Sequence, residues 1–170
     1  MFAFQQHGLQ PDAVVVAKPL AAGLPLAALI ARDTVAQAFS PGMHGTTFGG
    51  GPLQCRVALK FLGILERPGF LEQVRETGCY FKAQLEKLAA RSGVITQVRG
   101  EGLIVAAQLS VPCKEIVKQA LDAGFLFNCT QEKVLRFLPP LIIEKQHVDA
   151  LVAALEPILA VVTAAAATAN

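Results

Sequence analysis

Two short segments near the start of the chain carry residues whose types and spacing could perform chemistry. In the first, residues 13–31, Lys18 follows the apolar run 13–17 and precedes a turn of small residues. Apolar surroundings lower the pKa of a lysine amine, and a deprotonated amine can attack a carbonyl to form a Schiff base. We therefore predict that Lys18 is a desolvated, nucleophilic amine. The alternative is an ordinary lysine that extends its amine into solvent from a strand end.

The second segment, residues 40–52, is a loop of glycines and hydroxyl side chains that leads into a helix start. Glycines 49–51 allow backbone N–H groups to converge, Thr46 and Thr47 supply hydroxyl donors, and a helix N-terminus favours an anion. The alternative is a flexible glycine loop with a threonine cap, and we interpret His44 as a hydrogen-bonding residue. Together, the amine and the anion cradle suit an enzyme that holds a phosphorylated aldehyde.

A third candidate is Arg136, which apolar residues flank on both sides in the segment 134–141. An arginine in such a place can clasp a ligand carboxylate through two parallel hydrogen bonds. The alternative is a buried structural ion pair. The turn at residues 99–102 is interpreted as a tight strand connection, and we assign it no chemistry.

The composition limits the classes of function. The chain has 170 residues, of which 53% are hydrophobic and 16% charged, and its net charge is +2. Lys18, Pro19, Gly23 and Pro25 interrupt the longest apolar stretch, so we expect no membrane span, and the first residues lack the basic region of a signal peptide. The scattered basic residues argue against a nucleic-acid partner. The apolar composition instead indicates the buried part of something larger.

The four cysteines, Cys55, Cys79, Cys113 and Cys129, form no C-x-x-C pair and have no histidine nearby in the sequence. We therefore expect no metal site and no disulfide framework. Ordinary reduced cysteines in a cytoplasmic protein are the prediction.

Hydrophobic periodicity predicts two regions. Residues 1–66 read as a piece of an α/β layer, with a fully buried strand at 13–17, a strand or a helix at 26–31, and a helix from Pro52 to about Glu66.

A connecting helix is predicted over 67–92, because apolar residues recur every three or four positions from Leu71 to Leu88. Residues 93–162 read as a small α+β unit, followed by a frayed tail at 163–170. The unit contains two strand-like runs joined at 100–102, a helix at 113–123, strands at 125–129 and 134–138, and a last helix from about Glu144.

Five motifs together resemble the class III (subgroup II) pyridoxal-phosphate-dependent aminotransferases, in particular their acetylornithine/ornithine aminotransferase branch. The motifs are FAFQQHGLQPDAVVVAK, AAGLPLAALIA, HGTTFGGGPLQC, QVRGEGLI and VLRFLPPLII. The resemblance in order and spacing extends from about residue 2 to residue 160. The resemblance implies an α/β fold of the fold type I transferases. Residues 1–66 would be the end of the large cofactor domain, and residues 93–162 the small α+β C-terminal domain.

The resemblance also implies roles for the candidate residues. Lys18 would form the Schiff base with pyridoxal 5'-phosphate. Thr47, with Thr46 beside it, would reach the cofactor phosphate of the neighbouring subunit in a homodimer, and Arg136 would bind a substrate carboxylate. The reaction implied is transfer of an amino group from an N-acetylornithine- or ornithine-type donor to 2-oxoglutarate. The alternatives are a class III aminotransferase with a different amine donor, or a non-catalytic truncated gene product.

The sequence departs from the family pattern in two respects. The family usually has glycines after the lysine, where this chain has Pro19, Ala21 and Ala22. Family members are also about twice this length or more, so the resemblance implies a C-terminal segment. The part not present would carry the glycine-rich phosphate loop, the aromatic that stacks on the cofactor ring and the aspartate that pairs with its pyridine nitrogen. We therefore expect the chain alone to be inactive.

Overall fold

The computed structural model of the chain describes residues 1–168, and side-chain surroundings to residue 164. It divides into two compact units, Met1–Leu71 and Glu72–Asn170. The helix that was expected to connect two regions, α4 (Phe70–Ser92), belongs almost wholly to the second unit.

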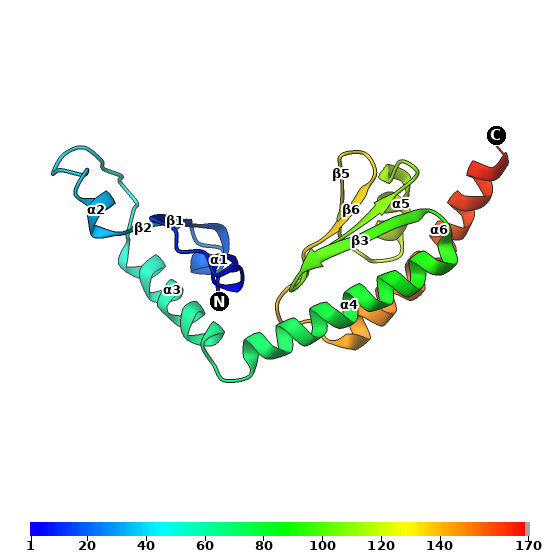
Figure 1. The fold of residues 1–170 in the computed structure, drawn as a ribbon, viewed down its shortest axis with the longest axis horizontal. Coiled ribbons are helices and arrows are strands. Elements are labelled where there is room, and N and C mark those ends of the chain that lie inside the picture. Colours follow the sequence, from blue (N-terminus) through cyan, green and yellow to red (C-terminus); the bar gives the residue numbers. More distant parts are fainter. Residues whose placement is uncertain (169–170) are drawn as a thin grey trace. The chain divides into compact units, whose positions relative to one another are not determined.

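The first unit is built on a two-stranded antiparallel sheet (Figure 1). Val14 of β1 lies opposite Ile30 of β2, so the segment that could have been helix or strand is a strand. The exposed Arg32–Asp12 ion pair, at 3.3 Å, joins the ends of the two strands, and pairs of this kind stabilise little. The elements of the unit are α1 (Ala3–Gln6), β1 (Ala13–Val16), the 3-10 helix η1 (Lys18–Ala21), β2 (Ala28–Ala31), α2 (Asp33–Ala36) and α3 (Pro52–Leu65).

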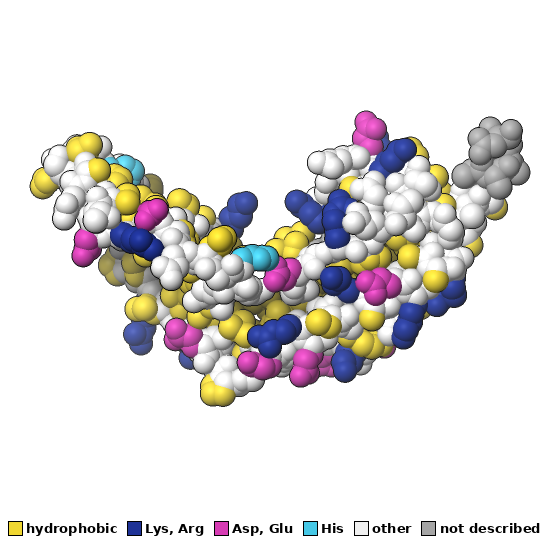
Figure 2. Space-filling view, in the orientation of Figure 1, with side chains coloured by type: hydrophobic (Ala, Val, Ile, Leu, Met, Phe, Trp, Pro, Cys, Tyr) yellow, Lys and Arg dark blue, Asp and Glu magenta, His cyan; other side chains and the backbone are white. Residues whose placement is uncertain are grey.

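This first unit buries very little apolar surface. The prediction of a fully buried valine strand is wrong for the chain as described, because Val15 of β1 is 73% exposed. The two-stranded sheet exposes one face and covers the other only in part, since Val14 and Val16 are half-buried. Hydrophobic side chains also lie on the surface around α2 and along α3 (Figure 2). Among the described residues of this unit, Ala21 and Ala58 are the only fully buried hydrophobic ones.

Helix α3 starts as predicted. Gly51 is its N-cap and Pro52 its first helical residue, a position where the missing N–H of proline costs nothing. The helix ends at Leu65, with Glu66 as its C-cap, one residue before the predicted end.

The second unit contains a four-stranded antiparallel sheet in the order β3-β4-β6-β5 (Figure 1). The two strand-like runs before residue 110 form the β3–β4 hairpin, as predicted, and β5 begins three residues later than predicted, at Asn128 instead of residue 125. The elements after α4 are β3 (Ile95–Glu101), β4 (Ile104–Leu109), α5 (Lys114–Asp122), β5 (Asn128–Thr130), β6 (Val134–Phe137) and α6 (Lys145–Thr168).

One face of this sheet is buried under the helices. Because side chains alternate along a strand, Leu135 and Phe137 of β6 point into the core while Arg136 points to the opposite face. We call that opposite face the open face. The core side chains supplied by α4, α5 and α6 include Phe81, Leu85, Leu88, Ile116, Ala120, Val148, Leu155 and Leu159.

Helix α6 is longer than the sequence predicted. It continues to Thr168, so the frayed tail expected from residue 163 is wrong as far as the structure describes it, and residues 169–170 lie outside the described part. By length and apolar composition, the span Lys145–Ala164 could cross a membrane. This is weak evidence for a membrane protein, because Leu155 and Leu159 of the same helix are buried in the core.

Polar contacts also join α4 to α6. The Tyr80 hydroxyl donates a hydrogen bond of 2.6 Å to Asp149 Oδ1, and this bond is the main reason that the pKa of Tyr80 is raised. Arg91 Nε donates to Glu156 Oε1 at 2.8 Å. Both pairs are largely exposed, so the apolar core contributes most of the stability.

The prediction of reduced cysteines is wrong for two of the four. Cys113, at the N-cap of α5, forms a disulfide with Cys129 of β5, and their Cα atoms are 5.7 Å apart. Sequence spacing did not reveal the pair because the two residues meet only when α5 and β5 fold against the same core. Cys55 and Cys79 are free.

We expect the disulfide to stabilise the second unit. It closes a loop with a sequence separation of 16 residues, and constraining an unfolded loop of that size is worth about 3 kcal/mol. Urea unfolding of Cys113→Ser, compared with Cys79→Ser as the control, should show that loss for the first variant only. Alkylation of four free thiols in the native protein would contradict the prediction.

A close backbone contact requires glycine in α4. A Cβ at Gly78 would overlap the backbone carbonyl of Gly102 in the β3–β4 turn, whereas a Cβ at Gly63 of α3 would meet nothing within 4 Å. Gly78→Ala should therefore destabilise the protein by about 1–3 kcal/mol despite the helix propensity of alanine. Gly63→Ala should stabilise it by up to about 1 kcal/mol. Thermal unfolding compares the two, and a stabilised Gly78→Ala would show that the contact is not tight.

Candidate functional site

Lys18 lies in an unusual backbone conformation directly after β1. Its φ is +50°, in the left-handed region, and it precedes a proline. Non-glycine residues in that region cost about 1–3 kcal/mol, and such strain is concentrated at functional sites. Two hydrogen bonds hold the turn, from Leu20 N to Ala17 O at 3.2 Å and from Ala22 N to Pro19 O at 2.9 Å.

The surroundings of Lys18 differ from the prediction. The side chain is exposed, so the expectation of a desolvated amine is wrong for the chain as described. The physical reason is the thin first unit, in which one face of the strand before Lys18 is exposed and the other is only half-buried. Exposure leaves the amine accessible to a carbonyl compound from solution.

The turn that holds Lys18 packs against α3. The fully buried residues of this unit, Ala21 and Ala58, belong to these two elements. Small side chains allow backbones to approach closely, which explains how alanine replaces a glycine of the family pattern at residue 21. Residues 40–51 lead directly into the same helix, so α3 links the lysine turn to the glycine loop.

The glycine loop is shaped by contacts that exclude side chains. A Cβ at Gly49 would overlap the methyl group of Thr46, and a Cβ at Gly51 would overlap the side chain of Gln54. Gly51 caps α3, whose first-turn N–H groups have no partner within the helix. Thr47 is exposed, and its hydroxyl makes no hydrogen bond to any described residue. The loop can therefore accept an anion through N–H groups and a free hydroxyl.

The interpretation of His44 as a hydrogen-bonding residue is wrong for the described part of the chain. His44 is exposed, and it makes no hydrogen bond within the part of the chain that the structure describes. We assign it no role.

Arg136 is on the open face of the four-stranded sheet. The alternative of a buried ion pair is excluded, because the residue is exposed and makes no ion pair with any described residue. Its Nε donates a hydrogen bond of 3.2 Å to Asn128 Oδ1 on the neighbouring strand. The Nη1 and Nη2 groups are left available for a ligand.

Asn128 was not among the predicted site residues. It lies opposite Arg136 in the β5–β6 register, and only this register makes the two residues neighbours. In the sequence, Asn128 could have been identified from the pattern of a short hairpin that carries a polar residue on each strand.

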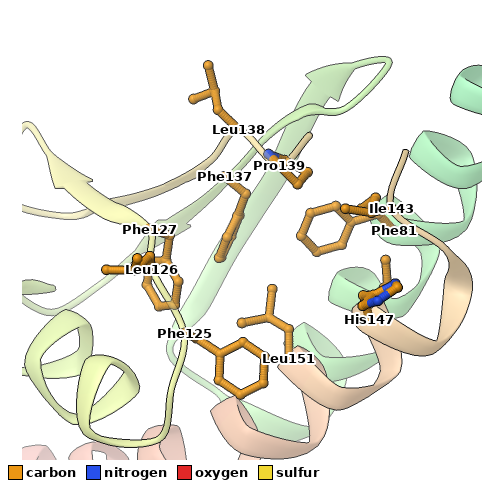
Figure 3. Close-up of a pocket in the computed structure, with 11 residues that line it drawn as sticks. Phe81, Phe125, Leu126, Phe127, Phe137, Leu138, Pro139, Ile143, His147 and Leu151 are labelled. Carbon is orange, nitrogen blue, oxygen red and sulfur yellow. The ribbon is translucent and has the colours of Figure 1, made fainter. Parts of the chain in front are cut away.

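The second unit also contains an apolar hollow of about 240 Å³ (Figure 3). Phe125, Phe127, Phe137 and Leu151 are among the side chains that line it. Phe137 and Arg136 are successive residues of β6 and point to opposite faces of the sheet, so the hollow and Arg136 are on opposite faces. We assign the hollow no part in the chemistry.

Comparisons with known proteins show which family this chain resembles. Residues 1–159 match the family described as aminotransferase class-III. The chain is 46% identical to the acetylornithine aminotransferases of Methanocaldococcus jannaschii and of Aquifex aeolicus, over 93% of its own length and 40% of theirs. The crystal structure of acetylornithine aminotransferase from Elizabethkingia anophelis superimposes with a TM-score of 0.84 at 29% identity, covering 92% of this chain and 41% of that one.

The chain thus spans about two fifths of the length of the curated relatives that it matches. Its α/β architecture is that of a portion of the fold type I, pyridoxal-phosphate-dependent transferases. The match covers both units and includes Lys18, the glycine loop and Arg136. The chain belongs to the class III aminotransferase family.

Proposed function

We propose that these residues form part of an aminotransferase that moves an amino group from an N-acetylornithine- or ornithine-type donor to 2-oxoglutarate. The observation that supports this most directly is Lys18, an accessible amine in a left-handed conformation at the end of β1, in a segment that resembles the family's lysine motif. The first unit would be the end of the cofactor domain and the second the small C-terminal domain. The whole would be a cytoplasmic homodimer.

The residues present fit two ends of pyridoxal phosphate, the cofactor of this family. Lys18 Nζ would hold the aldehyde carbon of the cofactor in its own subunit, and the loop before α3, with Thr46 and Thr47, would hold the phosphate of the cofactor in the neighbouring subunit. The fit rests on the first-turn N–H groups of α3, which have no partner within the helix, and on the exposed Thr47 hydroxyl. Gly49 and Gly51 let the loop lie close to the side chains of Thr46 and Gln54. When bound, the cofactor supplies an electron sink for the substrate carbon that loses a proton.

Lys18 would also move that proton. Its Nζ, once the substrate amine has replaced it, can take the proton from the amine-bearing carbon and return it elsewhere, acting as general base and then general acid. The stiff turn made by Pro19 would keep the amine near one position during both transfers, because proline fixes its own φ.

Arg136 would bind a carboxylate of the substrate. Nη1 and Nη2 can donate two parallel hydrogen bonds to one carboxylate, a pairing that also fixes its orientation. Both the amino acid and 2-oxoglutarate carry such a group, so one arginine can serve both half-reactions.

Catalysis would require more than this chain. The first unit has almost no core, and among its described residues the large hydrophobic Val15, Leu29, Ile30 and Phe48 are exposed. We therefore propose that activity belongs to the complete enzyme, meaning these residues together with the remaining length that the relatives have.

The first test maps the lysine. After incubation of the complete enzyme with pyridoxal phosphate and reduction with borohydride, peptide mass spectrometry should find the cofactor on Lys18, because that amine follows the strand end and the strained turn. Lys18→Ala should lose the adduct and keep its fold. An adduct on Lys60 or Lys87 instead would overturn the assignment.

The second test separates Thr47 from Arg136. Arg136→Ala should keep the cofactor spectrum and lower kcat/KM for 2-oxoglutarate, because a charge-assisted bidentate contact is worth about 2–4 kcal/mol, or roughly 30- to 1000-fold. Thr47→Ala should weaken cofactor retention instead. Arg99→Ala, also on the open face, is the control and should behave as the wild type. Loss of cofactor with normal KM in Arg136→Ala would mean that Arg136 is structural.

A further inference from the structure

The open face of the sheet holds a row of residues that the strand register aligns. Arg136 of β6 lies opposite Ala106 of β4 on one side and opposite Asn128 of β5 on the other. Directly opposed residues of antiparallel strands point to the same face, with Cβ atoms about 5 Å apart. The small Ala106 leaves the arginine side chain free on that side, so Asn128 is its neighbour with a hydrogen-bonding group.

The strand that carries Asn128 is an edge strand held by pairing on one side and by a covalent bond. β5 is only Asn128–Thr130, but Cys129 points into the core and is bonded to the fully buried Cys113. The backbone from Asn128 onward is therefore fixed by pairing to β6 and by the disulfide of the next residue. A short exposed side chain on such a strand has few positions to adopt.

We infer that Asn128 is a positioning residue that sets the direction in which Arg136 presents its guanidinium to a substrate carboxylate. The inference rests on the carboxylate role proposed above for Arg136. The N–H of Nε can only donate, so the amide oxygen of Asn128 must face it, and the 3.2 Å bond occupies this edge of the guanidinium. A carboxylate must then approach the outer edge, where Nη1 and Nη2 form the fork.

The amide is also suited to this task because it is neutral. It orients the arginine without cancelling its charge, whereas an aspartate at the same place would form an ion pair with the guanidinium. Such a pair would compete with the substrate carboxylate for the same cation. Asn128 would therefore affect carboxylate binding in two ways. It orients the guanidinium of Arg136, and it leaves the positive charge of that group unpaired.

The test compares variants of the complete, cofactor-loaded enzyme with 2-oxoglutarate as the varied substrate. Asn128→Ala should raise KM roughly 3- to 10-fold and leave kcat unchanged, because one orienting hydrogen bond of ordinary strength is lost. Asn128→Asp keeps the acceptor but should raise KM further than alanine does. Thr130→Ala, on the same face of the same strand, is the matched control and should not change KM.

A second measurement reads the geometry without turnover. In ¹⁵N-arginine-labelled protein, the Arg136 Nε–H should exchange slowly with solvent in the wild type, in Thr130→Ala and in Asn128→Asp, and rapidly in Asn128→Ala. Fast exchange combined with an unchanged KM in Asn128→Ala would overturn the inference. A wild-type KM in Asn128→Asp would overturn the argument from charge.

The outcomes also separate this inference from the proposed function. If Arg136→Ala raises KM and Asn128→Ala does not, Asn128 has no positioning role and the proposed function stands. If neither variant raises KM, the carboxylate role of Arg136 fails and the inference about Asn128 fails with it.

Discussion

The burial of one face of the four-stranded sheet determines most of what the second unit can do. Phe81 and Leu85 of α4 and Leu155 of α6 pack against that face, and alternation along β6 then leaves Arg136 on the other. A shift of one residue in the register of β6 would exchange the two faces and place a charged group in the core. The same packing that stabilises the unit therefore positions its carboxylate-binding candidate.

The first unit depends on a different constraint. Lys18 is held in a left-handed conformation by a short turn, and that turn is supported by the packing of η1 on α3, where Ala21 and Ala58 are buried. With no other fully buried hydrophobic residue among those described in this unit, a small contact has to hold both the lysine turn and the helix that follows the glycine loop. A larger side chain at either alanine would disturb the lysine turn and the helix after the glycine loop at once.

Local patterns predicted much of the fold. The apolar stripe of α4, the proline start of α3 and the β3–β4 hairpin were all visible because they depend on neighbours in the sequence. The sequence did not reveal the Cys113–Cys129 disulfide or the contact of Asn128 with Arg136, since both depend on strand register and packing between distant segments. Burial of the valine strand was predicted wrongly, because residue type indicates a preference for the interior and not the presence of a covering layer.

The central claim is that Lys18 is the residue of this chain that holds pyridoxal phosphate. The most direct measurement is the absorbance spectrum of the purified protein after incubation with the cofactor and removal of the excess. The complete enzyme should retain a visible band, and its Lys18→Ala variant should show none. A band of equal strength in both proteins would contradict the claim, because another group would then be holding the cofactor.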